Sequence, residues 1–167
     1  MSSVPGPDPR LQIRRLQSGD RAQVIEVYGD AVRSQAPGLY TPAQIEAWAA
    51  HPGREPDFPR SLARGYGLVS CSGARGGRVE AFALLDPSDR LSLLYCRGSA
   101  SRQGRGTALV RLLEARARQA GFRRLRTEAS RLSRPLLERL GWRVDTEEEV
   151  ILAGETFLRW RMIRDLG

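Results

Sequence analysis

The most constraining feature of this sequence is the stretch from residue 91 to residue 120, where a strand pattern, a glycine-bearing loop and a helix pattern follow one another. Residues 91–96 are apolar and few enough for a buried strand. Residues 104–120 place leucines and alanines on one face of a helix and charged side chains elsewhere, and Gly121 ends the pattern. A strand that leads through a loop directly into a helix favours a mixed α/β fold.

The loop before this helix predicts a binding site for a phosphate or pyrophosphate. The first N–H groups of a helix have no partner within the helix and carry a partial positive charge. Gly104 and Gly106 let the backbone approach an anion closely, and Arg102 and Arg105 add positive charge. The spacing matches neither the P-loop nor the complete dinucleotide motif G-x-G-x-x-G. From these residues alone, an ordinary glycine-bearing loop remains an alternative.

Further strand and helix patterns surround this unit. The predicted order is β-α-α-β-β-β-α-β-α-β-β, a mixed α+β arrangement of about seven mostly antiparallel strands and about four helices around one central sheet. The strand patterns cover residues 11–14, 66–71, 78–85, 91–96, 123–128, 142–152 and 155–163, and the helix patterns cover about 18–36, 41–50, 104–120 and 134–140.

The helix near residue 41 has a complete start signal. Thr41 suits the N-cap, Pro42 the first helical position, and Gln44 closes a capping box. Pro52 and Gly53 should end this helix. We expect a proline-rich loop from there to about residue 60, with His51 exposed to solvent in it.

Length and composition limit the classes of protein. The 167 residues suit one compact domain, expected at residues 10–167 after a flexible tail at residues 1–9. Two cysteines and one histidine make a disulfide framework, a metal site or a Ser-His-Asp triad unexpected. Because the sequence has neither a long apolar stretch nor a signal segment, we expect a cytoplasmic protein with no membrane partner.

The formal net charge of +8 raises the question of nucleic-acid binding. All 27 basic residues are arginine, which indicates a compositional bias, and they are scattered along the chain. No aromatic residues alternate with the basic clusters, so nucleic acid is not the expected partner.

Several segments resemble the Gcn5-related N-acetyltransferases, in element order over about residues 11–163. The acetyl-CoA motif of that family, Q/R-x-x-G-x-G/A after a strand, falls on residues 101–106, and residues 135–142 resemble the family's closing helix. Three further segments are similar to the bacterial YafP-like branch: LYTPAQIEAWA at 39–49, EASRLSRPLLERLGW at 128–142 and GETFLRWRM at 154–162.

The resemblance implies an acetyl-CoA site. In this family, backbone amides of the loop bind the pyrophosphate, and the preceding strand pairs with the pantetheine arm. A backbone N–H near Cys96 would face the thioester oxygen and stabilise the oxyanion, and Ser130 would contact pantetheine. The implied cofactor-binding residues are Leu94, Tyr95, Cys96, Arg102, Gln103, Gly104, Arg105, Gly106, Thr107, Ser130 and Leu137.

The sequence also departs from the family pattern. Ser101 replaces the usual Gln or Arg of the motif, and Leu137 replaces the tyrosine that often protonates the leaving thiolate. The usual carboxylate base on the fourth strand corresponds to Ser92. The nearby carboxylates are Glu80, Asp89 and Glu128, each of which can also be a solvated or structural charge.

The catalytic residues stay unassigned, with Tyr40, Ser92 and Glu128 as weak candidates. Tyr40 and Trp48 belong to the region that borders the acceptor site in this family. Tyr40 can equally be a packing residue, and core packing on a helix face is the favoured interpretation of Trp48. Cys96 has no histidine partner, so direct transfer without an acyl-enzyme is expected.

The favoured hypothesis is an acetyl-CoA-dependent N-acetyltransferase that acts by direct attack of a primary amine, on a small or peptide acceptor. The alternative is a non-catalytic acyl-CoA-binding module on the same fold. Dimers are common in the family, so a homodimer is a further expectation.

Overall fold

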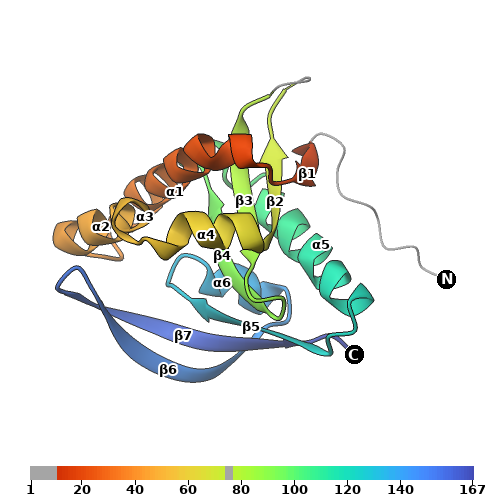
Figure 1. Cartoon of the computed structure of the whole chain (residues 1–167). Coiled ribbons are helices and arrows are strands. Elements are labelled where there is room, and N and C mark those ends of the chain that lie inside the picture. Colours follow the sequence, from red (N-terminus) through yellow and green to blue (C-terminus); the bar gives the residue numbers. More distant parts are fainter. Residues whose placement is uncertain (1–10, 74–76) are drawn as a thin grey trace.

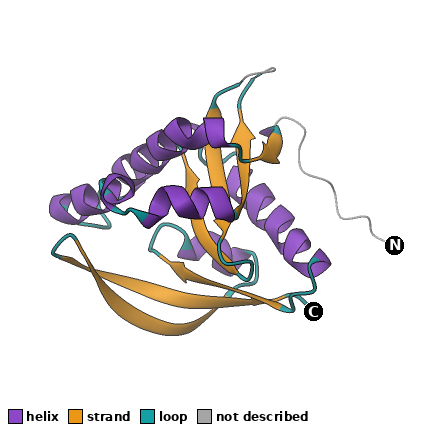
Figure 2. Cartoon of the chain, in the orientation of Figure 1, coloured by secondary structure: helices purple, strands orange, loops and turns teal. Residues whose placement is uncertain are grey.

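The protein is described by a computed structural model that covers residues 11–73 and 77–167. The tail predicted for residues 1–9 lies outside these ranges. The described residues form a seven-stranded sheet with helices on both faces (Figures 1 and 2). The strands are β1 (Ile13–Arg15), β2 (Tyr66–Cys71), β3 (Val79–Leu85), β4 (Arg90–Cys96), β5 (Arg124–Ala129), β6 (Arg143–Leu152) and β7 (Glu155–Asp165).

The sheet order is β1-β2-β3-β4-β5-β7-β6, and among the strand pairs of the described residues only β4–β5 is parallel. The predicted mixed fold with a mostly antiparallel central sheet is thus confirmed. The helices are α1 (Arg21–Gln35), α2 (Pro42–Ala49), α3 (His51–Arg54), α4 (Asp57–Arg64), α5 (Arg105–Gln119) and α6 (Arg134–Arg139), with short 3-10 turns at Ser18–Asp20 and Gly98–Ala100.

The core consists of two layers, one on each face of the sheet. Successive side chains of a strand point to opposite faces of the sheet, so those of β3 alternate between the two layers. Because both layers are packed, β3 is buried along its whole length. Phe82 and Leu84 pack with α1, α2 and α4, whereas Ala81 and Ala83 pack with α5 and α6. The small alanines leave room for the leucines of α5, and this packing holds the start of α5 beside the end of β4.

The start of α2 follows the predicted capping box. The Thr41 hydroxyl accepts the N–H of Gln44 at 3.2 Å, and the Gln44 side chain accepts the N–H of Thr41 at 2.9 Å. The Gln44 amide also donates to the carbonyl of Thr156 at 2.9 Å. The side chain that caps α2 therefore also ties it to β7.

The prediction of a loop from His51 to about residue 60 is wrong, because α3 and α4 fill this region. Pro52 lies in the first turn of α3 and Pro56 is the N-cap of α4, positions where no backbone N–H is needed for the helix. Pro59 lies in the first turn of α4. Phe58 and Leu62, four residues apart, bury the same face of α4 against the core.

None of the helices in the described ranges combines the length and the apolar character that a bilayer crossing needs.

Candidate functional site

The loop before α5 has the backbone geometry that the sequence predicted for an anion site. Gly104 is the N-cap of α5 and has a left-handed φ of 82°, and Arg102 has a φ of 61°. The first intrahelical bond runs from the N–H of Ala108 to the carbonyl of Gly104 at 3.0 Å, and within residues 11–73 and 77–167 no side-chain cap is present at this helix start. The amides of residues 105–107 therefore precede the helical bonding pattern and are available to a ligand.

The Arg105 side chain bonds mainly to β2 rather than lying free in this loop as the sequence predicted, and within the loop its Nε donates to Gln103 at 3.3 Å. Its guanidinium is buried and donates to the hydroxyl of Ser70 at 2.8 Å and to the carbonyl of Cys71 at 3.2 Å. The side chain thus ties the start of α5 to β2. Arg102 and Gln103 are exposed in the loop.

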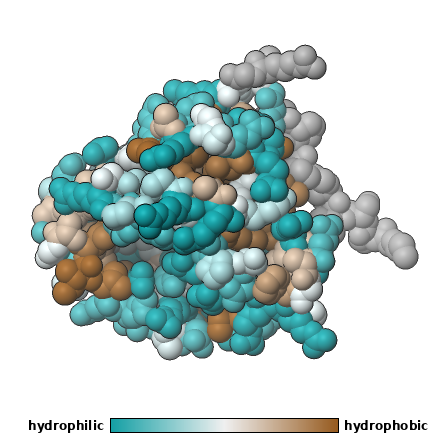
Figure 3. All heavy atoms as spheres, in the orientation of Figure 1, coloured by the Kyte–Doolittle hydropathy of each residue, from teal (hydrophilic) through white to brown (hydrophobic). Residues whose placement is uncertain are grey.

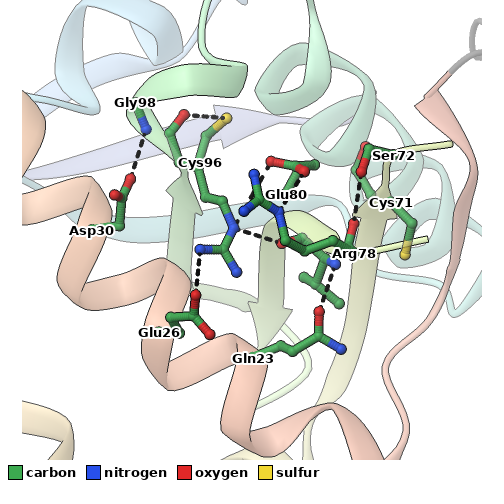
Figure 4. Close-up of polar contacts among 12 residues, drawn as sticks. Gln23, Glu26, Asp30, Cys71, Ser72, Arg78, Glu80, Cys96 and Gly98 are labelled. Atoms are coloured by element: carbon green, nitrogen blue, oxygen red, sulfur yellow. Dashed lines mark hydrogen bonds and ion pairs between the residues drawn. The ribbon is translucent and has the colours of Figure 1, made fainter. Parts of the chain in front are cut away.

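A second network holds the end of β4, where the loop begins (Figure 4). The buried guanidinium of Arg97 donates to Glu26 at 2.9 Å and lies 3.8 Å from the buried carboxylate of Glu80. The next N–H, that of Gly98, donates to Asp30 at 2.9 Å. These contacts with β3 and α1 set the position from which the loop departs.

Strands β4 and β5 pair over only two residues and then separate. The pairs are Arg90 with Arg126 and Leu91 with Thr127. Beyond Leu91, no strand of the described residues pairs with β4 on this side, so the backbone groups of this segment lie outside the hydrogen-bonding ladder of the sheet. A bulge opposite Leu84 and Leu85 inserts Ser92 into β4 at the point of separation.

The open backbone groups of β4 belong to alternate residues. The N–H of Arg97 donates to Glu80 on β3 at 2.8 Å, so by alternation the backbone of Leu94 and Cys96 faces away from β3. In agreement, the carbonyl of Cys96 accepts a bond from the Gln35 side chain at 2.7 Å. The backbone groups of Leu94 and Cys96 therefore point away from β3, and their pairing with pantetheine stays a prediction.

A cavity of about 150 Å³ fills the gap between the separated strands. It contains six of the predicted cofactor-binding residues. The lining residues are Ala31, Gln35, Trp48, Leu91, Ser92, Leu93, Leu94, Tyr95, Cys96, Gly106, Thr127, Glu128, Ser130, Leu132, Ser133, Leu136 and Leu137.

Three predicted residues on this cavity have defined chemistry. The hydroxyl of Ser130 accepts the N–H groups of Leu132 and Ser133 at 3.1 and 3.3 Å and so orders the turn before α6. Leu137 is fully buried and offers no proton. Burial raises the pKa of the Cys96 thiol to about 11, which makes it a poor nucleophile at neutral pH.

A larger cavity of about 570 Å³ adjoins the first. Trp48, Ser92, Leu93, Tyr95, Glu128 and Ser130 line both cavities, so these residues mark their junction. The larger cavity is further lined by Tyr28, Tyr40, His51, Glu55, Asp57, Phe58, Ser61, Arg90, Val150, Ile151, Leu152, Phe157, Leu158 and Arg159.

Sequence reasoning missed most of this second cavity. His51 is half-buried in its wall, rather than exposed in a loop, and burial lowers its pKa. Phe58 was assigned to the same loop. The spacing of Phe58 and Leu62 was the signal that could have revealed α4, whereas nothing local indicated that α4 and the β6–β7 hairpin face each other.

The candidate catalytic residues lie around the junction. Glu128 accepts a bond from Arg90 at 2.9 Å, and Ser92 donates to the carbonyl of Leu84 at 3.3 Å. Tyr40 lines the larger cavity, and its hydroxyl accepts the N–H of Arg131 at 3.0 Å. Burial raises the pKa of Tyr40, so the hydroxyl stays protonated.

The other two carboxylates considered from sequence lie elsewhere. Glu80 is buried beside Arg97, and Asp89 pairs with Arg126 at 3.2 Å near the surface. Neither lines a cavity of the site. Within residues 11–73 and 77–167, no group of His, Cys, Asp and Glu side chains has the arrangement of a metal site.

A protein-family model supplies the decisive comparison. The model for the acetyltransferase (GNAT) domain matches residues 68–164, more than half of the chain. The chain belongs to the Gcn5-related N-acetyltransferase (GNAT) family. The match spans β4, the loop and α5, which are the elements on which the resemblance was recognised.

Individual GNAT proteins are similar over most of the chain. The uncharacterised N-acetyltransferase YafP of Escherichia coli is 26% identical over 156 residues, which are 91% of this chain and 94% of YafP. A GCN5-related N-acetyltransferase from Rhodopseudomonas palustris has a TM-score of 0.85 at 22% identity, with 99% of both chains covered. The PaiA N-acetyltransferase of Thermoplasma acidophilum, solved with coenzyme A, has a TM-score of 0.73 at 17% identity over 92% of this chain and 98% of PaiA.

Proposed function

We propose that this GNAT protein transfers the acetyl group of acetyl-CoA to a primary amine. The observation that carries the proposal is the separation of β4 from β5 beside the uncapped start of α5. A thioester arm can enter this gap while its pyrophosphate binds the helix start. The complexes of PaiA with coenzyme A and of YncA from Salmonella typhimurium with acetyl-CoA support the choice of cofactor.

In the proposed complex, the amides of residues 102–107 bind the pyrophosphate, and the pantetheine arm runs along β4. Because the loop follows Cys96, the phosphate end of the cofactor lies near that residue and the acyl end lies further back along β4. The carbonyl of Cys96 would then accept a pantetheine N–H in competition with Gln35. The N–H of Leu94 would face the thioester oxygen and stabilise the oxyanion.

The amine nitrogen attacks the thioester carbonyl carbon, the bond from that carbon to sulfur breaks, and the products are an amide and CoA. We propose that Glu128 takes the proton that the amine loses, directly or through a water beside Ser92. Glu128 and Ser92 both lie at the junction of the cavities. Glu128 can therefore act in place of the carboxylate base that the family usually has at the position of Ser92. The CoA thiolate can leave unprotonated, so no acid is required at Leu137.

A non-catalytic acyl-CoA-binding module is the second candidate. The buried Leu137 and the engagement of Ser92 with a backbone carbonyl favour it. Both candidates require acetyl-CoA binding, and only the transferase releases CoA when an amine is added.

The first test is calorimetric titration with acetyl-CoA. We expect micromolar binding that a Gly104→Glu, Gly106→Glu double variant loses, because two carboxylates at the helix start repel the pyrophosphate. Gly53→Glu is the matched control, since Gly53 is exposed with open space around it and lies outside the site. Absence of binding by the folded native protein would overturn both candidates.

The second test is turnover of Glu128→Gln with an amine that the native protein acetylates. We expect the rate constant kcat to fall by about 10²–10⁴-fold, the usual contribution of a general base, while acetyl-CoA affinity is unchanged. Asp89→Asn should change kcat less than about twofold, since this substitution lies on the surface outside the cavities. Equal effects of the two variants would remove Glu128 from the mechanism.

A further inference from the structure

We propose that the acceptor is an arylalkylamine: a primary amine on a short chain that ends in an uncharged aromatic ring, with no carboxylate on the molecule. This inference rests on the proposed function and assigns the larger cavity to the acceptor. That cavity meets the cofactor cavity at Ser92, Glu128 and Ser130, so an amine placed there can reach the thioester.

The walls of the larger cavity suit an aromatic ring. Its volume of about 570 Å³ is in the range of small-molecule sites. The rings in the wall also contact one another, which holds them in place before a ligand arrives: the centroid of Trp48 lies 5.2 Å from that of Tyr40 and 6.3 Å from that of Phe157. The aromatic lining residues are Tyr28, Tyr40, Trp48, Phe58, Tyr95 and Phe157.

The β6–β7 hairpin extends this apolar character to the surface. Val150, Ile151 and Leu152 line the cavity, and Ile151 is 77% exposed. Figure 3 shows hydrophobic atoms gathered at the end of the molecule where Figure 1 places the tip of this hairpin and α2. An acceptor with an apolar body therefore meets apolar surface already at the rim.

The charges of the cavity argue against an acceptor that carries a carboxylate. The cavity contains two guanidinium groups, and each already has a carboxylate partner. Arg90 pairs with Glu128 at 2.9 Å, and Arg159 with Glu148 at 2.5 Å. Burial lowers the pKa of His51, so this side chain is neutral at neutral pH and offers no further cation. A carboxylate on the acceptor would have to compete with Glu128 and Glu148 for these guanidinium groups, at a cost in desolvation.

The carboxylates favour a single cationic centre at the junction. Glu128 lies there; its Oε2 accepts the bond from Arg90, and its Oε1 can attract the ammonium form of the amine before that amine is deprotonated. Asp57 is held by two hydrogen bonds from Arg64, and Glu55 accepts the N–H of Asp57 at 3.0 Å. Arg64 thus neutralises Asp57, and away from the junction most of the lining side chains are aromatic or aliphatic, which favours a ring over a second ammonium group.

The test compares four amines that differ in one feature each: 2-phenylethylamine, butylamine without the ring, 1,4-diaminobutane with a second amine, and L-phenylalanine with a carboxylate. The ratio kcat/KM is measured from CoA release at saturating acetyl-CoA. We expect 2-phenylethylamine to exceed butylamine and diaminobutane by about tenfold or more, and phenylalanine by about a hundredfold or more.

A variant pair locates the ring. Leu152→Trp should fill part of the larger cavity and raise the KM for 2-phenylethylamine about tenfold or more, with unchanged acetyl-CoA affinity, because Leu152 does not line the cofactor cavity. Val144→Trp is the control, since Val144 is on the same strand, exposed and outside both cavities. Equal effects of the two variants would place the ring elsewhere and overturn the assignment.

Two readouts separate this inference from the proposed function. Preferred turnover of butylamine, diaminobutane or phenylalanine overturns the acceptor class and leaves the acetyltransferase standing. If acetyl-CoA binds and no amine reacts, the catalytic proposal fails, and quenching of tryptophan fluorescence by the four amines decides the acceptor class. Selective binding of 2-phenylethylamine then supports the inference, and equal or absent binding overturns it.

Discussion

Replacing Gly104 by alanine should weaken acetyl-CoA binding more than replacing Gly106 by alanine, although the surrounding space suggests the opposite. A methyl group at Gly104 would meet no atom within 4 Å, whereas one at Gly106 would lie 2.9 Å from Cδ2 of Leu136. The difference is in the backbone. Gly104 has a φ of 82°, a conformation that costs an L-residue about 1–2 kcal/mol, whereas Gly106 lies in the first turn of α5.

The size of the change in Kd depends on whether the strain at residue 104 is present in the free protein or only in the complex with acetyl-CoA. The Gly104 loop is exposed, so in the free protein an alanine can relax out of the left-handed conformation that presents the amides. The cost then falls on binding, and the Kd for acetyl-CoA should rise about 5–30-fold. At Gly106 the obstructing atom is the tip of a flexible leucine, and alanine is the better helix former, so we expect a change in Kd below about threefold.

The assay is calorimetric titration of both variants with acetyl-CoA, together with urea unfolding. If the loop does not relax, the cost of about 1–2 kcal/mol at Gly104 lowers the free energy of unfolding instead of weakening binding. The loss in binding free energy and the loss in unfolding free energy should therefore add up to this cost. A Gly106→Ala variant that binds more weakly than Gly104→Ala would refute the reasoning. The position of Leu136 would then matter more than the turn at Gly104.

Three further predictions follow from buried groups. Alkylation of Cys96 at pH 8 should be on the order of a hundredfold slower than that of a free thiol, because the pKa of Cys96 is about 11. The Cys96→Ser variant should retain turnover. Fast alkylation of the native protein together with loss of turnover in Cys96→Ser would point to an acyl-enzyme. Hydrogen bonds from Arg14 hold the pKa of Asp20 below its ordinary value. The melting temperature of the native protein should therefore exceed that of Asp20→Asn near pH 6, and this difference should disappear as the pH falls below about 4. A difference in melting temperature that does not change with pH would contradict this prediction. Arg97→Met should cost about 3–5 kcal/mol in urea unfolding, because it leaves Glu80 buried without this partner, and a second change, Glu80→Gln, should recover part of the loss.

Local patterns predicted most of the elements, because each depends on neighbours in sequence. The prediction for β2 has the same limits as the strand in the structure, that for β4 differs by one residue at its start, and that for α5 differs by one residue at each end. The capping box at Thr41 formed as expected, since it requires only side chains three residues apart. Residues 51–60 were misjudged because prolines suggest a loop when their places within helical turns are unknown.

The candidate site also has parts that depend on one continuous segment and parts that depend on distant residues. The position of the loop from Arg102 to Thr107 before a helix start could be predicted, because it depends on one continuous segment, and its anion-binding role stays a prediction. The burial of the Arg105 side chain could not be predicted, since its partners Ser70 and Cys71 lie more than thirty residues away on another strand.

The chain's residues and their local spacing therefore determined the elements, the glycine turn at Gly104 and the resemblance to the GNAT family. The packing of distant segments decided the rest: the separation of β4 from β5, the meeting of Ser92 with Glu128, and the aromatic cavity between α2, α4 and the β6–β7 hairpin. The physical reason is that hydrogen bonds and helical periodicity act between neighbours in the chain. Cavities and charge pairs depend instead on how whole elements pack, which no local pattern encodes.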